Sequence, residues 1–337
     1  MNKRPTIADI ARLCGVTPAT VSRVLNNNQN FSSSAAVRQK IQDTARNLGY
    51  MPDIGARNLS LRNSRVVGLF ASPHIHIAEG INESLIDGIT ETLNAGGYDV
   101  FYGLGRRRKS TNRRVPDWRF DGAVLMQAPR PEAVAELDSR RVPYVCVNDR
   151  IGTPIAFVLA DEQMGMKSAI SHLLDLGHER IAYANAMTSY YPHYSTDERY
   201  ATLLAEARKQ NFTLVPGHNE LFHSDAASKF LRTMVLEGGA TAVIAYDHQI
   251  AFMILGASHA MGLRIPQDFS LVCFNDVFPS GIIYPSLTCV AVPGREMGRI
   301  AAELLLNRIA SRKRVAGREI RVAEHLIVRS STSTLQR

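Results

Sequence analysis

Residues 6–25 constrain the fold most strongly, because they hold two short helical patterns separated by only a few residues. Thr6 suits the N-cap of the first pattern, an aspartate three residues later completes the start signal, and Gly15 suits its end. Thr17 and Pro18 then open a second helix, which stops at a run of asparagines. Two helices joined by so short a turn predict a helix-turn-helix.

A third helical pattern follows at 34–48 and ends at Gly49. Apolar residues at helical spacing predict the inward faces of the three helices: Ile10, Ala11 and Leu13 in the first, Val21, Val24 and Leu25 in the second, and Val37, Ile41, Ala45 and Leu48 in the third. This arrangement leaves Pro18, Ala19, Ser22 and Arg23 facing outward on the second helix. The first 50 residues are therefore expected to be an all-α module.

The charge of the chain is unevenly distributed. The net charge is +8, and residues 1–63 hold nine basic and three acidic side chains. Residues 64–337 contribute only +2 of that total. A small basic segment on a nearly neutral body is typical of a nucleic-acid-binding module.

The outward residues of the second helix suit contact with a major groove. Arg23 can read guanine with two hydrogen bonds, small residues allow close approach to base edges, and hydroxyls suit phosphate oxygens. A generic three-helix surface module with a solvated Arg23 is the alternative. The DNA-contacting residues expected in this module are Thr6, Thr17, Pro18, Ala19, Thr20, Ser22 and Arg23.

From residue 65 onward, short apolar runs alternate with amphipathic helices. Strands are predicted at 66–70, 100–102, 123–126, 144–147, 181–183, 242–245 and 271–274, and helices at 81–95, 164–176, 199–210, 226–237 and 250–261. Continuous apolar strands alternating with helices predict parallel sheets covered on both faces. A segment of this length exceeds one such core, so two lobes are expected.

Several motifs together resemble the LacI/GalR family. TIADIARLCGVTPATVSRVLNNN is similar to its DNA-binding signature, and ADEQMGMKSAISHLLDLGHERIAYA, RIPQDFSLVCFNDV, PSLTCVAVPGREMG and EHLIVRSSTS are similar to segments of its body. The resemblance covers nearly the whole chain. It implies a helix-turn-helix domain at 1–50, a hinge helix at 51–63, and at 64–337 a two-lobed α/β periplasmic-binding-protein-like domain that holds an effector between its lobes.

The stretch NLGYMPDIGARNLSLRNS resembles the family's hinge. The resemblance implies that two hinge helices of a dimer meet in the minor groove of operator DNA. There Leu59, beside Ala56, would wedge between base pairs and bend the duplex. A buried linker contact is the alternative role for Leu59.

Effector contacts in such sheets are expected at the carboxyl ends of strands. The candidates that follow strands are Ser72, Asp149, Asp247 and Asn275. The resemblance adds Arg199 as a guanidinium that holds ligand hydroxyls or carboxylates, and Tyr191 lies in an aromatic run that could stack on a sugar ring. Each of these residues could instead be a polar surface-loop residue.

Two departures from the family pattern bear on the effector. Asn275 stands where the family usually has aspartate, so a negative charge is lost. A basic loop at 106–114 replaces the family's acidic helix. It is either a solvated loop or a second patch facing phosphate or effector.

Motifs for other functions are missing from the sequence. It contains no G-x-S-x-G, H-E-x-x-H, G-x-x-x-x-G-K or G-x-G-x-x-G, so an enzyme is not expected. The four scattered cysteines favour neither a metal site nor a disulfide, and no cofactor is expected. The absence of an apolar leader favours a cytoplasmic protein over a secreted solute-binding protein.

These observations predict a transcription regulator, expected to be a repressor. It should bind a pseudo-palindromic double-stranded operator as a homodimer, since no leucine heptad follows the final strand to build a tetramer. A sugar is the expected effector, and a purine, a nucleoside or a corepressor is the alternative.

Overall fold

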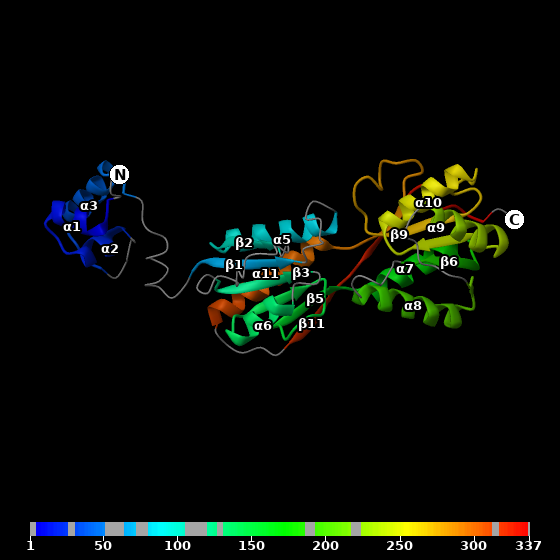
Figure 1. Ribbon diagram of the computed structural model, residues 1–337, viewed down its shortest axis with the longest axis horizontal. Coiled ribbons are helices and arrows are strands. Elements are labelled where there is room, and N and C mark those ends of the chain that lie inside the picture. The colour runs from blue at the N-terminus through cyan, green and yellow to red at the C-terminus, as the bar shows by residue number, and fades with distance from the viewer. Residues whose placement is uncertain are drawn as a thin grey trace. The chain divides into compact units, whose positions relative to one another are not determined.

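A computed structural model describes residues 5–25, 31–50, 64–71, 80–104, 120–126, 131–185, 193–216, 224–311 and 317–335. The chain forms two compact units, Met1–Ser64 and Arg65–Arg337 (Figure 1). The predicted hinge at 51–63 lies outside the described residues, so the division into three parts stays a prediction.

The first unit consists of three helices, α1 (Ile7–Cys14), α2 (Pro18–Leu25) and α3 (Ala35–Asn47). The backbone N–H of Asp9 donates to Thr6 Oγ1 at 3.3 Å, and that of Thr6 donates to the Asp9 carboxylate at 3.0 Å, which completes a capping box. Gly15 ends α1 in the left-handed conformation at φ 71°, which costs glycine little. The local signals therefore place α1 and α2 where the pattern predicts them.

The core of the first unit differs from the predicted inward faces at two leucines. Its buried residues are Ile10, Ala11, Cys14, Val21, Val24, Ile41 and Ala45. Leu13 is 56% exposed because Cys14, four residues after Ile10, occupies the inner face of α1 instead. Leu48 is 37% exposed because it lies beyond the last residue of α3, as its C-cap. Both inward assignments were wrong.

The second unit contains two six-stranded sheets. Lobe 1 is the fully parallel sheet of order β11-β5-β4-β3-β1-β2. Its strands are β1 (Val66–Ala71), β2 (Asp99–Leu104), β3 (Gly122–Met126), β4 (Tyr144–Val147), β5 (Ala156–Ala160) and β11 (Arg318–Val322), and its helices are α5 (Ile81–Ala95), α6 (Pro131–Ser139) and α11 (Gly294–Ser311). Helices α5 and α11 pack on one face, and α6 packs on the other.

Lobe 2 has the order β12-β10-β9-β8-β6-β7, in which only β12 runs antiparallel to its neighbour. Its strands are β6 (Arg180–Ala184), β7 (Thr213–Leu214), β8 (Ala242–Ala245), β9 (Ser270–Phe274), β10 (Thr288–Ala291) and β12 (His325–Ile327). Its helices are α7 (Glu162–Asp175), α8 (Tyr194–Gln210), α9 (Ser224–Phe230), the π-helical η1 (Leu231–Glu237) and α10 (His248–Ala260). Helices α7 and α8 cover one face, whereas α9, η1 and α10 cover the other.

The chain crosses between the lobes three times, after β5, after β10 and after β11. Every residue of β3, β4, β8 and β9 is buried, as expected for parallel sheets covered on both faces. The predicted two-lobed α/β architecture is therefore confirmed. No helix in the described part of the chain is long and apolar enough to span a membrane.

Candidate functional site

The start of α2 presents an exposed polar surface. Pro18 and Ala19 are exposed, and the side chain of Thr17 accepts a hydrogen bond from the backbone N–H of Thr20 at 3.2 Å. The two threonine hydroxyls lie 2.9 Å apart, and Ser22 is half-buried one turn further on. Thus Thr17, Pro18 and Ala19 are accessible at the start of this helix, whereas Thr20 and Ser22 are only partly accessible.

Arg23 is exposed at the end of this surface, and an aromatic ring restricts its position. Its guanidinium carbon lies 5.3 Å from the centre of the Phe31 ring, within the range of a cation–π contact. Phe31 packs against the core of the unit, and its carbonyl accepts a hydrogen bond from Arg38 at 3.4 Å. Phe31 was not among the predicted site residues, although an aromatic residue follows the asparagine run in the sequence.

The ion pairs of this unit leave the α2 surface cationic. Within residues 5–25 and 31–50, the ion pairs join Arg12 to Asp9 and Arg46 to Asp43, and none involves Arg23. The hydroxyl of Thr6 is occupied in the cap of α1, so this predicted DNA contact has a structural role in the described unit. Ala56 and Leu59 lie outside the described residues.

In the second unit, three predicted effector residues lie after strand ends as expected. Asp149 is buried two residues after β4, and its carboxylate accepts from the backbone N–H of Arg150 at 2.7 Å. Asp247 follows β8 and caps α10 by accepting from the backbone N–H of Ile250 at 2.9 Å. Ser72 and Tyr191 lie outside the described residues.

Asn275 follows β9 directly and adopts the left-handed conformation at φ 71°, which asparagine tolerates better than most residues. Its side-chain oxygen is buried and finds no hydrogen-bond partner in the described part of the chain. A buried acceptor without a donor costs about 1–3 kcal/mol. A ligand that donates a hydrogen bond there would offset this cost.

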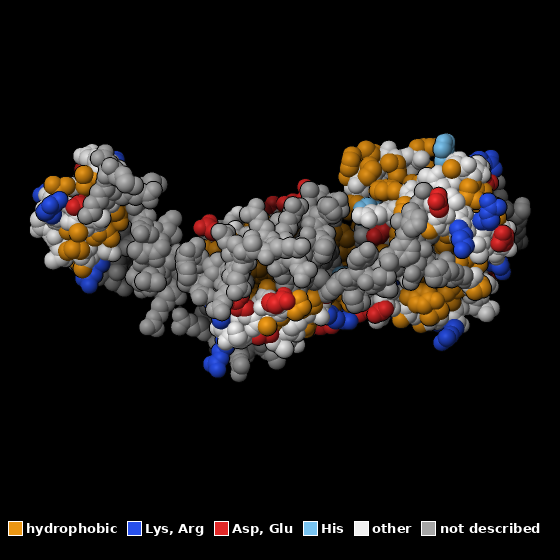
Figure 2. Space-filling view, viewed as in Figure 1, with side chains coloured by type: hydrophobic (Ala, Val, Ile, Leu, Met, Phe, Trp, Pro, Cys, Tyr) orange, Lys and Arg blue, Asp and Glu red, His pale blue; other side chains and the backbone are white. Residues whose placement is uncertain are grey.

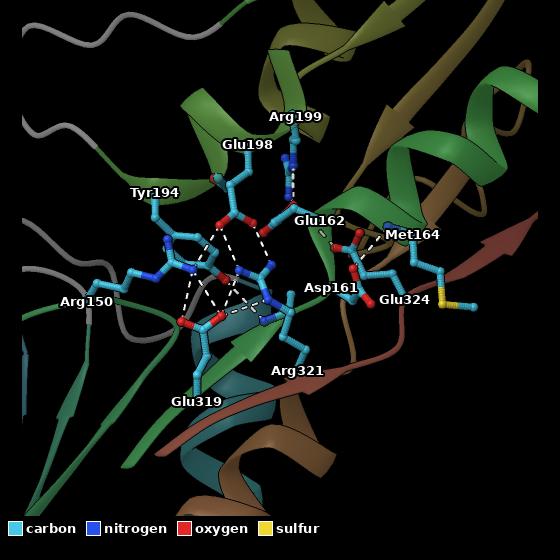
Figure 3. A network of polar contacts seen from close by, with 12 residues as sticks. Arg150, Asp161, Glu162, Met164, Tyr194, Glu198, Arg199, Glu319, Arg321 and Glu324 are labelled. Atoms are coloured by element: carbon cyan, nitrogen blue, oxygen red, sulfur yellow. Dashed lines mark hydrogen bonds and ion pairs between the residues drawn. The ribbon is translucent and has the colours of Figure 1, made fainter. Parts of the chain in front are cut away.

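Arg199 is only 3% exposed. It lies in the second turn of α8, whereas the sequence pattern predicted it as the first residue of a helix. Its Nε donates to Glu162 at 2.5 Å (Figure 3). A terminal nitrogen donates to the carbonyl of Tyr246 at 2.6 Å. Its guanidinium carbon lies 3.8 Å from the centre of the Phe274 ring. The side chain is therefore held by the protein itself on several sides.

Glu324 lies beside the ion pair of Arg199 and Glu162, on the third crossover between the lobes. One of its oxygens is 3.9 Å from Arg199, but neither oxygen has a hydrogen-bond partner among the described residues. Burial, together with the charge of Glu162, raises the pKa of Glu324 well above its ordinary value, although Arg199 lowers it. A methyl group on Gly165 would overlap the carboxylate, so this glycine provides the space that Glu324 occupies.

Glu198, next to Arg199 on α8, connects the two lobes. Its carboxylate accepts from both terminal nitrogens of Arg321 in β11, at 2.6 and 2.8 Å, and lies 3.0 Å from Arg150, which follows β4. Burial alone would raise the pKa of Glu198, but the hydrogen bonds and charges of the two arginines lower it below its ordinary value. Glu319 accepts from both arginines on the lobe 1 side, at 3.1 and 2.8 Å.

Comparison with known proteins agrees with this architecture. Residues 6–53 match the family model of bacterial regulatory proteins of the lacI family, and residues 170–332 match the periplasmic binding protein-like domain. Relatives include the regulator CelR of Thermobifida fusca (27% identical, covering 98% of both chains) and the repressor PurR of Vibrio vulnificus (24%, covering 91% of this chain and 93% of PurR). The ribose operon repressor of Halalkalibacterium halodurans is 27% identical and covers 97% of both chains.

Two solved structures have the same fold. The CelR–cellobiose complex superposes with a TM-score of 0.69 at 26% identity, covering 97% of this chain and all of that one. The lac repressor dimer bound to operator and the anti-inducer ONPF gives a TM-score of 0.80 at 22% identity, covering 98% and 100%.

A helix-turn-helix with an exposed cationic recognition surface, followed by two parallel-sheet lobes, defines a DNA-binding transcription regulator with a ligand-binding body. The chain belongs to the LacI family of bacterial transcription regulators.

Proposed function

We propose that this regulator represses carbohydrate-utilisation genes and that a sugar bound between its lobes controls its affinity for a pseudo-palindromic operator. The observation that carries this proposal is the accessible polar surface of α2, where Thr17, Pro18 and Ala19 are exposed at the start of the helix and Arg23 is exposed in its last turn. Its relatives support the sugar, because they include a ribose operon repressor and a CelR structure with cellobiose.

On the operator side, Arg23 reads guanine, Pro18 and Ala19 approach base edges, and threonine and serine hydroxyls contact phosphates. Leu59, beside Ala56, wedges into the minor groove. Replacing Leu59 with alanine should then reduce operator bending together with affinity, as measured by gel phasing. An unchanged bend would remove Leu59 from this role.

On the effector side, Asp149 of lobe 1 faces a ligand together with Arg199, Asp247 and Asn275 of lobe 2. Buried acceptors suit the hydroxyls of a sugar, and the unpartnered oxygen of Asn275 supports this chemistry. Arg199 has two donors occupied by protein groups, so its remaining donors would be available to the ligand. Ser72 and Tyr191 complete the proposed set.

A homodimer is the proposed assembly. The loop after β9 exposes Phe278, Ile282 and Tyr284 by 84, 74 and 95%, and Figure 2 shows hydrophobic side chains gathered over this loop. Exposed apolar clusters of this kind mark interaction surfaces. Two copies present two recognition helices to successive major-groove turns.

DNA binding and its control by an effector involve no catalytic step. We place the regulator in the cytoplasm, together with the operator DNA.

The test is fluorescence anisotropy of the purified protein on its own upstream DNA and on scrambled duplex at equal salt. We expect the upstream DNA to bind at least ~10³-fold more tightly, and cellobiose, ribose or glucose to change that affinity at least ~5-fold. Equal affinity for both duplexes, with and without sugars, would refute the proposal. A response to purines alone would support a second candidate, the purine-controlled repressor that the PurR relative suggests.

A further inference from the structure

We propose that Glu198, Arg150 and Arg321 form an inter-lobe latch that holds the lobes together across the effector site and thereby raises effector affinity. The part concerning effector affinity rests on the proposed function. Glu198 belongs to α8 of lobe 2, whereas Arg321 lies on β11 and Arg150 follows β4 in lobe 1 (Figure 3).

The two arginines of the latch also share a carboxylate within lobe 1. Glu319 accepts from Arg321 at 2.8 Å and from Arg150 at 3.1 Å, so one carboxylate holds both arginines in place. Arg321 donates from its two terminal nitrogens to the two oxygens of Glu198, which is the two-bond geometry that makes arginine–carboxylate pairs specific. Arg150 lies 3.0 Å from one of the same oxygens. The side chains are partly buried, with 16% exposure for Glu198 and 27% for Arg321, so solvent screens the pair incompletely.

Further contacts with lobe 1 come from residues just before Glu198. The hydroxyl of Tyr194 donates to the side chain of Asn148 at 3.2 Å and accepts from the backbone N–H of Ala160 at 3.1 Å. The ring of His193 lies 2.8 Å from the carbonyl of Asn148. The start of α8 is thus joined to lobe 1 at several independent points.

The latch lies on the same chain segments as the proposed effector residues. Arg150 directly follows Asp149 in lobe 1, and Glu198 directly precedes Arg199 in lobe 2. A movement of the first turn of α8 away from lobe 1 must therefore also shift Arg199 relative to Asp149. A ligand that contacts both lobes binds more tightly when the protein already holds them in position.

The first measurement tests the latch without any ligand. In the full-length protein, spin labels at Glu132→Cys on α6 and Lys229→Cys on α9 report the distance between the lobes, because both sites are exposed and the native cysteines are buried. Glu198→Gln should broaden the distance distribution. Glu303→Gln is the matched control, since it removes an arginine partner on α11 within one lobe, and it should leave the distribution unchanged.

The second measurement is titration calorimetry with cellobiose, ribose and glucose. The sugar that binds the unmodified protein should bind Glu198→Gln about 3–10-fold more weakly, with no change in Glu303→Gln. Adding Arg321→Gln to Glu198→Gln should weaken binding little further, because both substitutions remove the same pair.

An unchanged distance distribution in Glu198→Gln would show that the latch does not hold the lobes. Unchanged or tighter sugar binding, with a broadened distribution, would overturn the link to effector affinity. If no sugar binds the unmodified protein, the proposed effector class is wrong, but the distance measurement still decides whether the latch exists.

Discussion

Two arginines in different units both lie over a phenylalanine ring, yet their surroundings are opposite. Arg23 is exposed at the end of α2, 5.3 Å from the Phe31 ring. Arg199 is buried on the inner face of α8, 3.8 Å from the Phe274 ring, and is bonded to Glu162. In the first unit, the polar side chains of α2 are accessible to a partner. In the second, the charged groups bond to one another, so removing one of them affects the fold before it affects a ligand.

Arg199→Met should produce the largest effect. It leaves the carboxyl groups of Glu162 and Glu324 buried without their cation, which costs about 3–5 kcal/mol. Urea unfolding followed by circular dichroism measures this loss. A loss below about 1 kcal/mol would mean that Arg199 is not a structural residue and would break the comparison.

Arg23→Ala should weaken operator binding by about 1–3 kcal/mol, because it removes the contact that distinguishes guanine from other bases at one position of the operator. The free energy of unfolding should change by less than about 0.5 kcal/mol, because the side chain is exposed. Binding titrations against operators substituted at each position measure the first effect, and urea unfolding measures the second. Equal losses on every DNA sequence would contradict base reading by this residue.

Gly165→Ala tests whether the space around Glu324 is required. The added methyl group overlaps the carboxylate and approaches Val290 to 2.9 Å, so we expect a destabilisation of about 1–3 kcal/mol in urea unfolding. Gly256→Ala in α10 is the matched control, because nothing lies within 4 Å of its added methyl. The control should gain up to about 1 kcal/mol from helix propensity. Equal effects at both glycines would show that the carboxylate moves freely.

Glu324 should make stability depend on pH. Its pKa in the folded chain lies above the ordinary value of 4.5, owing to burial and the charges of Glu162 and Asp161, with Arg199 opposing them. Its contribution is therefore fully present below 4.5 and is lost as the pH rises through the folded-state pKa. Glu324→Gln carries no charge, so its free energy of unfolding should decline less than that of the unmodified protein as the pH rises. Parallel pH curves in urea unfolding would show that Glu324 titrates normally.

Phe31→Leu should have the smallest effect. It keeps an apolar contact with the core but removes the ring beneath Arg23, so operator affinity should fall by about 0.5–1 kcal/mol. Phe31→Tyr keeps the ring and should restore the affinity. If Phe31→Leu binds like the unmodified protein while Arg23→Ala does not, the ring has no part in positioning Arg23.

The helices of the first unit were predictable because their signals are local. Helix α1 lies between its N-cap Thr6 and its C-cap Gly15. Helix α2 begins at Pro18, directly after Thr17. The predicted start of α8 at Arg199 was five residues late. The true N-cap is His193, and the first turn of α8 packs against lobe 1, which no local pattern reveals.

The environment of Arg199 could not be read from the sequence. Its partners Glu162, Tyr246 and Glu324 come from three distant segments, and a buried acid such as Glu324 contradicts the usual exposure of its residue type. The strand-end positions of Asp149, Asp247 and Asn275 were predictable because the sheet topology alone sets them. Helix α11 was not predicted, although its buried residues Met297, Ala301 and Leu305 follow helical spacing in the sequence.

The three crossovers also determine when the molecule can be completed during synthesis. The edge strand β11 of lobe 1 spans Arg318–Val322, and β12 of lobe 2 spans His325–Ile327. Neither sheet can therefore acquire its last strand until these few residues have left the ribosome. A chain released before Arg318 lacks an edge strand in both lobes at once, so termination before that residue cannot yield one intact lobe attached to a DNA-binding head.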